Sequence, residues 1–387
     1  MELMERLVRA AVERGAQSLH IKSGDIFRAR IHGDLVGLSE SPFTPEDTRR
    51  IARRLLPTET DRERLDEIRD MDFAWELKDL ARFRVNILRQ RNSYMVVMRV
   101  IPWRVPTLRE LNLPPVLGEI ADYDDGMVLV TGATGVGKST TQAAMVGWLN
   151  RNRRKHIITL EDPIEYWHDN DQCTITQREV GMDTESFRTG LRAALRQDPD
   201  VILVGEMRDL EAAEIALEAA ETGHLVVSTM HAATATGALK HLTALFPDQH
   251  EEIVRTRLGD ALRAIVSQRL VLTADGSGSV PAVEILRVTE AIRDCILRGE
   301  VQQEIVELMK QGREQYGMQT FDQHLMDLVE AGFVSYETAL ESATNPSDFE
   351  LYMRTLRRQE DEGADEALEA VGSDGQLVGE KGLTQRF

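Results

Sequence analysis

Apolar and polar residues follow two different patterns along the chain, and the pattern changes near residue 116. In residues 1–101, apolar side chains recur at helical spacing from Leu3 to Val12, and a second helix is expected from Thr44 to about Leu56. Short runs of strand-forming residues, separated by turn residues, predict strands in the same region. These runs are Ser18 to Ile21, Phe27 to Ile31, Leu35 to Leu38, Met71 to Trp75, Ala81 to Leu88 and Tyr94 to Ile101. The first region is therefore expected to be an α+β domain.

Beyond about Val116, almost wholly apolar runs alternate with helical segments. The runs expected to be strands are Met127 to Thr131, His156 to Leu160, Val201 to Glu206, Leu225 to Thr229 and Ala282 to Leu286. Apolar helices are also expected from about Gln249 to Arg269. Successive apolar strands with helices between them indicate a mostly parallel sheet that is covered on both faces. The predicted fold class is therefore α/β, with the α+β domain placed first.

These patterns predict how the chain is divided into domains. An N-terminal domain is expected over residues 1–101, a linker over 102–115, an α/β domain over 116–358 and an acidic tail over 359–387. The linker contains four prolines, which make it semi-rigid because proline fixes φ. The tail is rich in glycine and poor in large apolar residues, so it is expected to be disordered.

Composition narrows the class of protein. The net charge of −19 and the pI of about 5.0 argue against a general nucleic-acid binder, which would usually be basic. No stretch approaches the roughly 18 apolar residues of a membrane span, and the N-terminus lacks the apolar core of a secretory signal. Cys173 and Cys295 belong to no paired motif, so the sequence indicates neither a zinc site nor a disulfide framework, and a cytoplasmic location is expected.

One motif organises the α/β region. Gly132-Ala133-Thr134-Gly135-Val136-Gly137-Lys138-Ser139 fits the pattern G-x-x-x-x-G-K-[ST] between an expected strand and an expected helix that includes Thr140. The glycines let backbone N–H groups approach phosphate oxygens, and the helix directs its positive end at the same anion. Lys138 can reach the β- and γ-phosphates, and the Ser139 hydroxyl can ligate Mg²⁺. ATP with Mg²⁺ is the expected ligand.

Acidic residues follow two other expected strands. The strand that starts at Val201 ends in Glu206, which could hold Mg²⁺ or orient the attacking water. Glu161, Asp162 and Glu165 form a second group, whose mutual repulsion a bound cation would relieve. Because ligands of parallel sheets bind at the carboxyl ends of the strands, we expect these acids near the phosphate loop. Ser139, Glu206, Glu161 and Asp162 are the candidate metal ligands, and Glu165 is the candidate base.

Two histidines and two arginines are weaker candidates. His224 and His231 bracket the strand Leu225 to Thr229, and either could contact the γ-phosphate or be an ordinary core or surface histidine. Arg82 and Arg84 share one face of the strand Ala81 to Leu88. The alternation of residues alone favours an ordinary solvated face for these arginines.

Taken together, the motifs resemble those of type IV pilus retraction ATPases, the PilT/PilU group of the secretion-ATPase superfamily. The resemblance covers about Leu3 to Arg357. It rests on the phosphate loop as Walker A, Ile158 to Glu165 as the Asp box, Asp198 to Arg208 as Walker B, and Thr222 to His231 as the His box. Some positions, such as Ala133 where proline is usual in PilT, resemble PilU. Others, such as Ala291-Ile292-Arg293, resemble PilT, so the subgroup stays open with a preference for PilU.

The resemblance implies a PAS-like N-terminal domain joined to a RecA-like ATPase domain in a homo-hexamer. It implies ATP hydrolysis for pilus retraction at the cytoplasmic face of the inner membrane, with a pilus platform protein and a paralogous retraction ATPase as partners and without nucleic acid. Glu165 would be the catalytic glutamate and Glu206 the acid near Mg²⁺, with Lys138, His224 and His231 beside them. Arg82 and Arg84 would reach the nucleotide, often across a subunit boundary.

Three alternatives remain open. A pilus-extension or type II secretion ATPase would usually carry a four-cysteine zinc insert, which this sequence lacks. A nucleic-acid translocase is disfavoured by the acidic charge and by the absence of a basic-aromatic strip. A PilU-type accessory subunit would act mainly through its paralogue, although the intact Lys138 and acidic residues disfavour a non-catalytic role.

Overall fold

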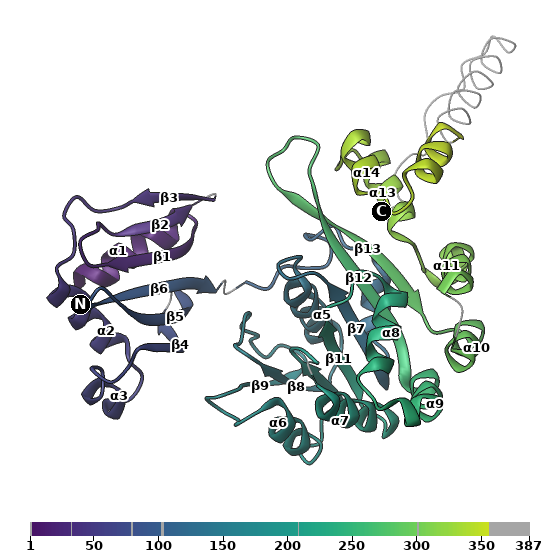
Figure 1. Ribbon diagram of the computed structural model, residues 1–387, viewed down its shortest axis with the longest axis horizontal. Helices are drawn as coiled ribbons and strands as arrows, with labels where there is room; N and C mark the ends of the chain where they lie inside the picture. The colour runs from purple at the N-terminus through teal and green to yellow at the C-terminus, as the bar shows by residue number, and fades with distance from the viewer. Residues whose placement is uncertain are drawn as a thin grey trace, which may run out of the picture.

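The computed structural model describes residues 2–31, 33–78, 80–101, 104–207, 209–299 and 302–355 (Figure 1). The described residues form two sheets; one hydrophobic core packs on the first sheet, and a core packs on each face of the second. The expected acidic tail over 359–387 lies outside the described residues, as do Pro102 of the expected linker and Arg208 of the expected Walker B motif.

An antiparallel six-stranded sheet occupies the N-terminal region, in the order β3-β2-β1-β6-β5-β4. Its strands are β1 (Ala16–Lys22), β2 (Arg28–Ile31), β3 (Asp34–Gly37), β4 (Asp70–Leu77), β5 (Ala81–Gln90) and β6 (Ser93–Ile101). Its helices are α1 (Glu2–Glu13), α2 (Pro45–Leu55) and α3 (Glu59–Glu63). The elements expected from the sequence in this region are confirmed, with their ends moved by a residue or two.

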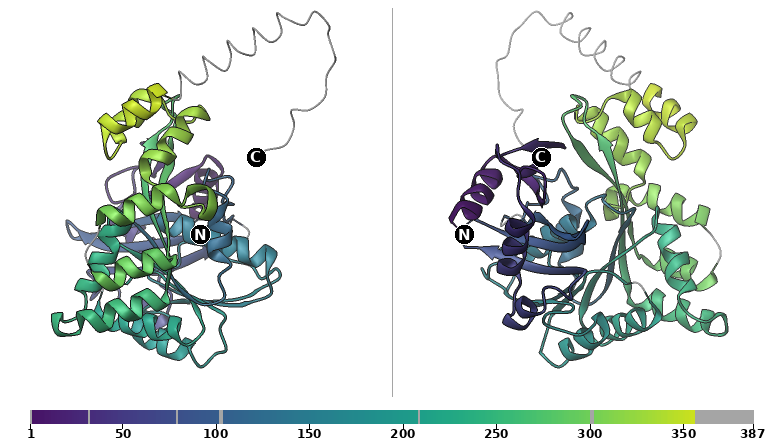
Figure 2. Two further views of the ribbon diagram at one scale, coloured as in Figure 1. Left: turned by 90° about the vertical axis from the view of Figure 1, so that its right-hand side faces the viewer. Right: turned by 60° about the vertical axis from the view of Figure 1, so that its left-hand side comes forward.

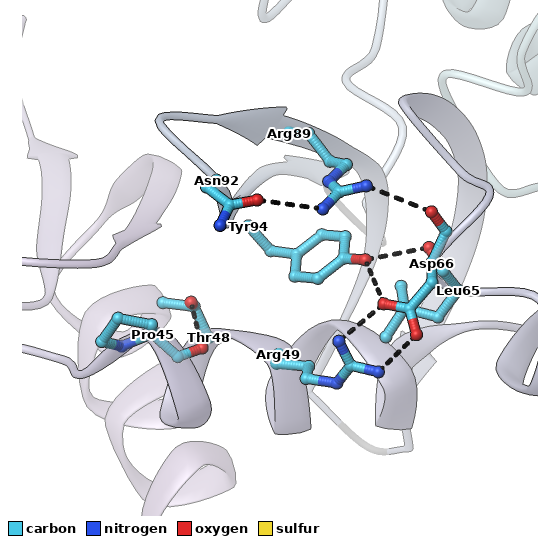
Figure 3. Close-up of polar contacts among 8 residues, drawn as sticks. All are labelled: Pro45, Thr48, Arg49, Leu65, Asp66, Arg89, Asn92 and Tyr94. Carbon is cyan, nitrogen blue, oxygen red and sulfur yellow. Dashed lines mark hydrogen bonds and ion pairs between the residues drawn. The ribbon is translucent and has the colours of Figure 1, made fainter.

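Local sequence explains where α2 begins and what holds it. The Thr44 hydroxyl accepts a hydrogen bond from the Asp47 amide, and the Asp47 carboxylate accepts one from the Thr44 amide, which makes a capping box. Further along, both terminal nitrogens of Arg49 donate to the Asp66 carboxylate at 2.6 Å, and the Tyr94 hydroxyl donates to the Leu65 carbonyl (Figure 3). These bonds fasten α2 to the segment before β4 and to β6.

A seven-stranded sheet forms the second region, in the order β13-β12-β7-β11-β10-β8-β9. All neighbours are parallel except β12 and β13, so the mostly parallel α/β sheet predicted from the sequence is confirmed. Its strands are β7 (Gly126–Gly132), β8 (His156–Glu161), β9 (Thr174–Glu179), β10 (Val201–Val204), β11 (Leu225–Met230), β12 (Leu262–Leu272) and β13 (Ser279–Arg287).

Helices cover both faces of this sheet because its central strands bury alternate apolar residues on each side. Leu129 on β7 packs in one core with α6 (Phe187–Ala194), α7 (Leu210–Glu221), α8 (Ala235–Ala244) and α9 (Glu251–Ala261). Val130 packs in the other core with α4 (Val116–Ala121) and α5 (Lys138–Asn152). A short 3₁₀ helix, Asp248–His250, precedes α9. Among the described helices, none has the length and apolar character needed to cross a bilayer.

The C-terminal helices are α10 (Glu290–Arg298), α11 (Gln302–Gln311), α12 (Arg313–Tyr316), α13 (Phe321–Glu330) and α14 (Tyr336–Ser342). β12 and β13 run on past the rest of the sheet as a long hairpin (Figures 1 and 2). Val271 and Val280 on this hairpin pack against Phe321 and Leu325 of α13 in a separate small core. α13 begins with a capping box, which Thr320 and Gln323 form.

One expectation was wrong and one strand was missed. Helices were expected up to Arg269, but α9 ends at Ala261 and β12 follows directly. The apolar run that begins at Leu262 fits a buried helix and a buried strand equally well, and pairing with β7 decides between them. The strand β9 was not expected, because Thr174–Glu179 is polar and lies at the sheet edge.

Part of the segment expected to be a linker, residues 102–115, is packed in a hydrophobic core. Leu108 and Leu113 are buried in the same core as Leu117 and Ile120 of α4. The second half of this segment therefore packs on the parallel sheet and its helices.

Candidate active site

The phosphate loop follows β7 and leads into α5, as its motif requires. Gly132 has φ of 146°, and a Cβ at this position would lie 2.4 Å from the carbonyl oxygen of Gln268 on the neighbouring β12. A side chain cannot be accommodated there, so the loop leaves the sheet through a glycine. Ala133, Thr134 and Gly135 at the tip are exposed, and Ser139 and Thr140 lie in the first turn of α5. The exposed tip and the helix N-terminus form a suitable cradle for phosphate.

Lys138 lies between this loop and the predicted acids. Its ammonium donates to the carbonyl oxygens of Gly132, at 3.0 Å, and Ala133, at 2.9 Å. Partial burial lowers the pKa of Lys138, whereas the negative charges of Glu206 and Glu165 act to raise it. Because β7, β8 and β10 are parallel, the segments that follow them and carry Lys138, Glu165 and Glu206 leave the sheet at the same end.

Glu206 lies just past β10 and is paired with His231, which lies just past β11. The His231 Nε2 and Glu206 Oε1 atoms are 2.8 Å apart, and the Glu206 side chain is 19% exposed. The Thr229 hydroxyl donates to the Gly205 carbonyl and the Met207 amide donates to the Thr229 carbonyl, so the two strand ends are fastened together. The structure thus brings together Lys138, Glu165, Glu206 and His231.

Glu165 is an exposed residue on a loop that is anchored at both ends. On one side, the Glu161 carboxylate accepts hydrogen bonds from the Thr159 hydroxyl, the Gln177 amide and, at 3.4 Å, the Glu165 backbone N–H. On the other side, the hydroxyls of Tyr166 and Thr140 are 3.0 Å apart. Burial raises the pKa of Glu161. These contacts give Glu161 a part in holding the loop that presents Glu165 beside the start of α5.

Asp162 is exposed and near Glu179, whose pKa it helps to raise, although burial is the larger cause. The Glu179 carboxylate accepts a hydrogen bond from the Ile164 amide and lies 3.5 Å from the guanidinium of Arg82. Arg82 also lies over the Trp167 ring, 5.1 Å from its centroid. Arg82 of the N-terminal sheet is thus held by residues of the parallel-sheet region.

Arg84 lines a cleft between the two sheets. The cleft has a volume of about 1090 Å³, and its walls include Arg84 from β5 and Thr140 and Glu165 from the other region. Arg84 also lies 3.6 Å from Asp72. Arg84 therefore lines the same cleft as Glu165, and its expected contact with a nucleotide stays a prediction.

His224 does not belong to this group, which corrects the expectation for that residue. It precedes β11, and its carbonyl accepts a hydrogen bond from Gly126 at the start of β7. Its ring faces the Ala219 carbonyl at 3.1 Å. β11 and β7 are parallel, so the start of β11 and the end of β7 lie at opposite ends of the strands. His224 is therefore a full strand length away from the phosphate loop. His231, at the other end of the same strand, is the histidine that pairs with Glu206.

The side-chain oxygen atoms of the site fit a Mg²⁺ ion that is bound partly by the protein and partly by phosphate. Among the described residues, no three His, Cys, Asp or Glu side chains are grouped to hold a metal alone. Mg²⁺ is usually bound by one or two protein oxygens together with phosphates and waters. The Ser139 hydroxyl and the Glu206 carboxylate match that need better than Glu161, which already accepts three hydrogen bonds, or Asp162, which faces Glu179.

Three supporting residues were not recognised in the sequence. Gln268 contacts the phosphate loop, but it was hidden in the segment interpreted as helix. Glu179 ends the strand β9, which was not expected, and it pairs with Glu161 only in the folded register, so no local signal marked it. Tyr166 directly follows the Asp box and could have been considered as its anchor.

Comparison with known proteins finds similar proteins over most of the chain. The family model for "Type II/IV secretion system protein" matches residues 1–295. The chain is 42% identical to the type IV pilus ATPase PilU of Pseudomonas aeruginosa, over 90% of this chain and 91% of that protein. It is 40% identical to the retraction ATPase PilT of the same organism, over 90% of this chain and all of that protein (100%). The crystal structure of the retraction motor PilT with bound ADP has a TM-score of 0.82 and 41% identity, covering 89% of this chain and 98% of that chain.

Matches of this extent confirm the resemblance inferred from the four motifs, and they cover both sheets of the structure. The chain therefore belongs to the type II/IV secretion system protein family and, within it, to the group of the type IV pilus ATPases PilT and PilU.

Proposed function

We propose that this protein is an ATP-hydrolysing motor that drives type IV pilus retraction. The observation that carries the proposal is that Lys138, Glu165, Glu206 and His231 meet at one edge of the parallel sheet, beside a phosphate loop. Relatives that share about 40% of their residues over nearly the whole chain are named pilus ATPases, and one related structure contains ADP.

Each residue has a distinct chemical task in this proposal. Lys138 turns from the carbonyls of Gly132 and Ala133 to the β- and γ-phosphates and neutralises their charge. Glu165, exposed on its anchored loop, accepts a proton from the attacking water. Glu206 and His231 are paired at 2.8 Å, so a shift of Glu206 on loss of the γ-phosphate would also move His231 at the end of β11. Mg²⁺, held with help from Ser139 and Glu206, would neutralise charge on the phosphate oxygens.

The domain arrangement belongs to the same proposal. A PAS-like domain over residues 1–101 and a RecA-like ATPase domain over about 116–358 would rotate about the segment between them. The contacts of Arg82 with Glu179 and Trp167 support a nucleotide-dependent contact between the domains. In a homo-hexamer, Arg82 and Arg84 would serve the site of the same or a neighbouring subunit. The motor would act in the cytoplasm against an inner-membrane platform protein.

The catalytic assignment is tested with purified protein and MgATP. Glu165→Gln should lower kcat by about 100-fold or more, because general-base catalysis contributes that much, while nucleotide binding persists. Lys138→Ala should weaken nucleotide binding itself. Glu185→Gln, at an exposed glutamate without a hydrogen bond or ion pair among the described residues, is the matched control. Full activity of Glu165→Gln would show that another group activates the water.

A PilU-type accessory role is the second candidate, because the identities to PilU and PilT, 42% and 40%, are almost equal. Deleting the gene in cells with and without the paralogous ATPase, and scoring twitching motility, separates the two roles. A protein that retracts pili alone supports motility without the paralogue. An accessory subunit supports motility only when the paralogue is present.

A further inference from the structure

Gln268 lies at the point where β12 passes the phosphate loop. Its side chain is almost completely buried, with 3% of the residue exposed. The Nε2 atom donates to the Val136 carbonyl at 2.5 Å, and the Oε1 atom accepts from the Thr141 hydroxyl at 2.8 Å. The Gln268 side chain therefore joins the middle of the loop to the first turns of α5.

The chemistry of these contacts fixes the orientation of the amide group. A carbonyl oxygen can only accept a hydrogen bond, so the Val136 carbonyl requires the NH₂ end of the side chain. The hydroxyl of Thr141 then donates to the remaining oxygen. Asparagine would be one methylene too short to span both contacts, and glutamate would place an oxygen against the Val136 carbonyl.

Holding the Val136 carbonyl also orients a donor for the phosphate. A trans peptide is planar, and its C=O and N–H groups point in opposite directions. With the Val136 carbonyl directed at Gln268, the N–H of Gly137 points to the other side of the loop. Gly137 is the N-cap of α5, where backbone N–H groups bind anions.

Among the described residues, the other hydrogen bonds from side chains to the carbonyls of this loop come from Lys138, to Gly132 and Ala133. Lys138 must give up these contacts when it reaches toward a phosphate. The bond from Gln268 to Val136 involves no group that the nucleotide needs. It can therefore keep the loop in place both before and after a nucleotide arrives.

We propose that Gln268 is a positioning residue that holds the phosphate loop in its binding conformation and thereby raises the affinity for nucleotide. The inference rests on the proposed ATPase function. Gln268 does not touch the reacting atoms, so its contribution falls mainly on binding and much less on the chemical step.

The test compares wild-type full-length protein with Gln268→Glu and Gln268→Ala. Nucleotide affinity is measured with a fluorescent ADP analogue, and KM and kcat with MgATP. Both variants should weaken nucleotide affinity by about tenfold, the factor that corresponds to about 1.4 kcal/mol, while kcat at saturation stays close to wild type. Gln268→Glu keeps the size of the side chain, so this variant is expected to fold.

Ser267→Ala is the matched control. Ser267 is the preceding residue on β12, is equally buried and shares a 2.8 Å hydrogen bond with Thr131 of β7, and among the described residues its hydroxyl has no hydrogen bond to a carbonyl of the loop. It should lose a little thermal stability and keep the wild-type affinity. An equal loss of affinity in Ser267→Ala would show that damage to β12, and not the Val136 contact, is responsible.

The pH dependence of Gln268→Glu gives an independent readout. Burial raises the pKa of a carboxyl group, and a protonated carboxyl can donate to the Val136 carbonyl. The affinity ratio of wild type to Gln268→Glu should therefore shrink as the pH falls from about 8 to about 6, whereas the ratio to Gln268→Ala should stay constant. Wild-type affinity in Gln268→Glu at pH 8 would overturn the inference. Failure of the wild-type protein to bind any nucleotide would instead refute the proposed function.

Discussion

Burial of Glu284 should make the ATPase domain less stable as the pH rises. Glu284 lies on β13 and is 6% exposed. Its Oε1 atom accepts a hydrogen bond from the Ala235 amide in the first turn of α8. Burial raises its pKa from 4.5 to about 7, the nearby Asp322 adds to the rise, and the Ala235 bond and the charge of Arg269 oppose it. The perturbation that tests this is Glu284→Gln, which removes the titration and keeps an acceptor for Ala235.

The direction of the change in stability with pH follows from the number of protons that Glu284 binds in the folded and the unfolded chain. Between pH 4.5 and about 7 the unfolded chain releases the Glu284 proton while the folded chain keeps it, so stability is greatest at low pH and is lost as the pH rises through the folded pKa. One pKa unit corresponds to about 1.4 kcal/mol, so the full effect is roughly 3 kcal/mol. Between pH 5 and pH 8 the effect is about 2.5 kcal/mol, or about 5–10 °C in Tm for a domain of this size.

The assay is thermal unfolding of both proteins across this pH range, followed by intrinsic fluorescence. Tm of Glu284→Gln minus Tm of the wild type should increase toward high pH by the stated amount. Glu330→Gln, at an exposed glutamate of α13 without a hydrogen bond or ion pair among the described residues, should show no such increase. A difference that stays constant with pH would refute the reasoning, because it would mean that Glu284 titrates alike in the folded and unfolded chain.

Two further predictions concern contacts around the site. Tyr166→Phe removes the hydrogen bond to Thr140 and loosens the loop that carries Glu165. In ATP-hydrolysis assays kcat should therefore fall about fivefold, while Tm in thermal unfolding stays unchanged. An unchanged kcat would show that the loop needs no such anchor. Arg82→Ala leaves the buried Glu179 without its cation and should lower Tm, and adding Glu179→Gln should restore part of the loss, with a coupling of about 1 kcal/mol or more in a double-mutant cycle. Simple additivity would argue against a stabilising contact between the domains.

Much of the fold could be predicted because its elements have strong local signals. Buried parallel strands such as β7 and β10 are continuous apolar runs, and few other structures place such runs between helices. The helix expected to begin at Thr44 does so, with Thr44 and Asp47 forming the capping box of α2. The position of Lys138, Glu206 and Glu165 was also predictable, because parallel strands bring their carboxyl ends to one edge.

Other features have no local signal. The run that begins at Leu262 forms β12 only because a place beside β7 is available to it. The strand β9 is polar and is defined by its pairing with β8. His224 and His231 look equivalent in the sequence, since each flanks the same strand, and the direction of β11 separates them by the whole strand length.

The sequence by itself determined the glycine-rich loop after β7, the acidic residues that follow β8 and β10, and the alternation of strands and helices, because these depend on neighbours within a few residues. Only the tertiary structure decided which side chains support the site. Gln268 reaches Val136 across 132 residues of chain, and Arg82 reaches Glu179 from another sheet. Such contacts depend on how separate elements pack, and a buried polar group must find its partner wherever packing places one.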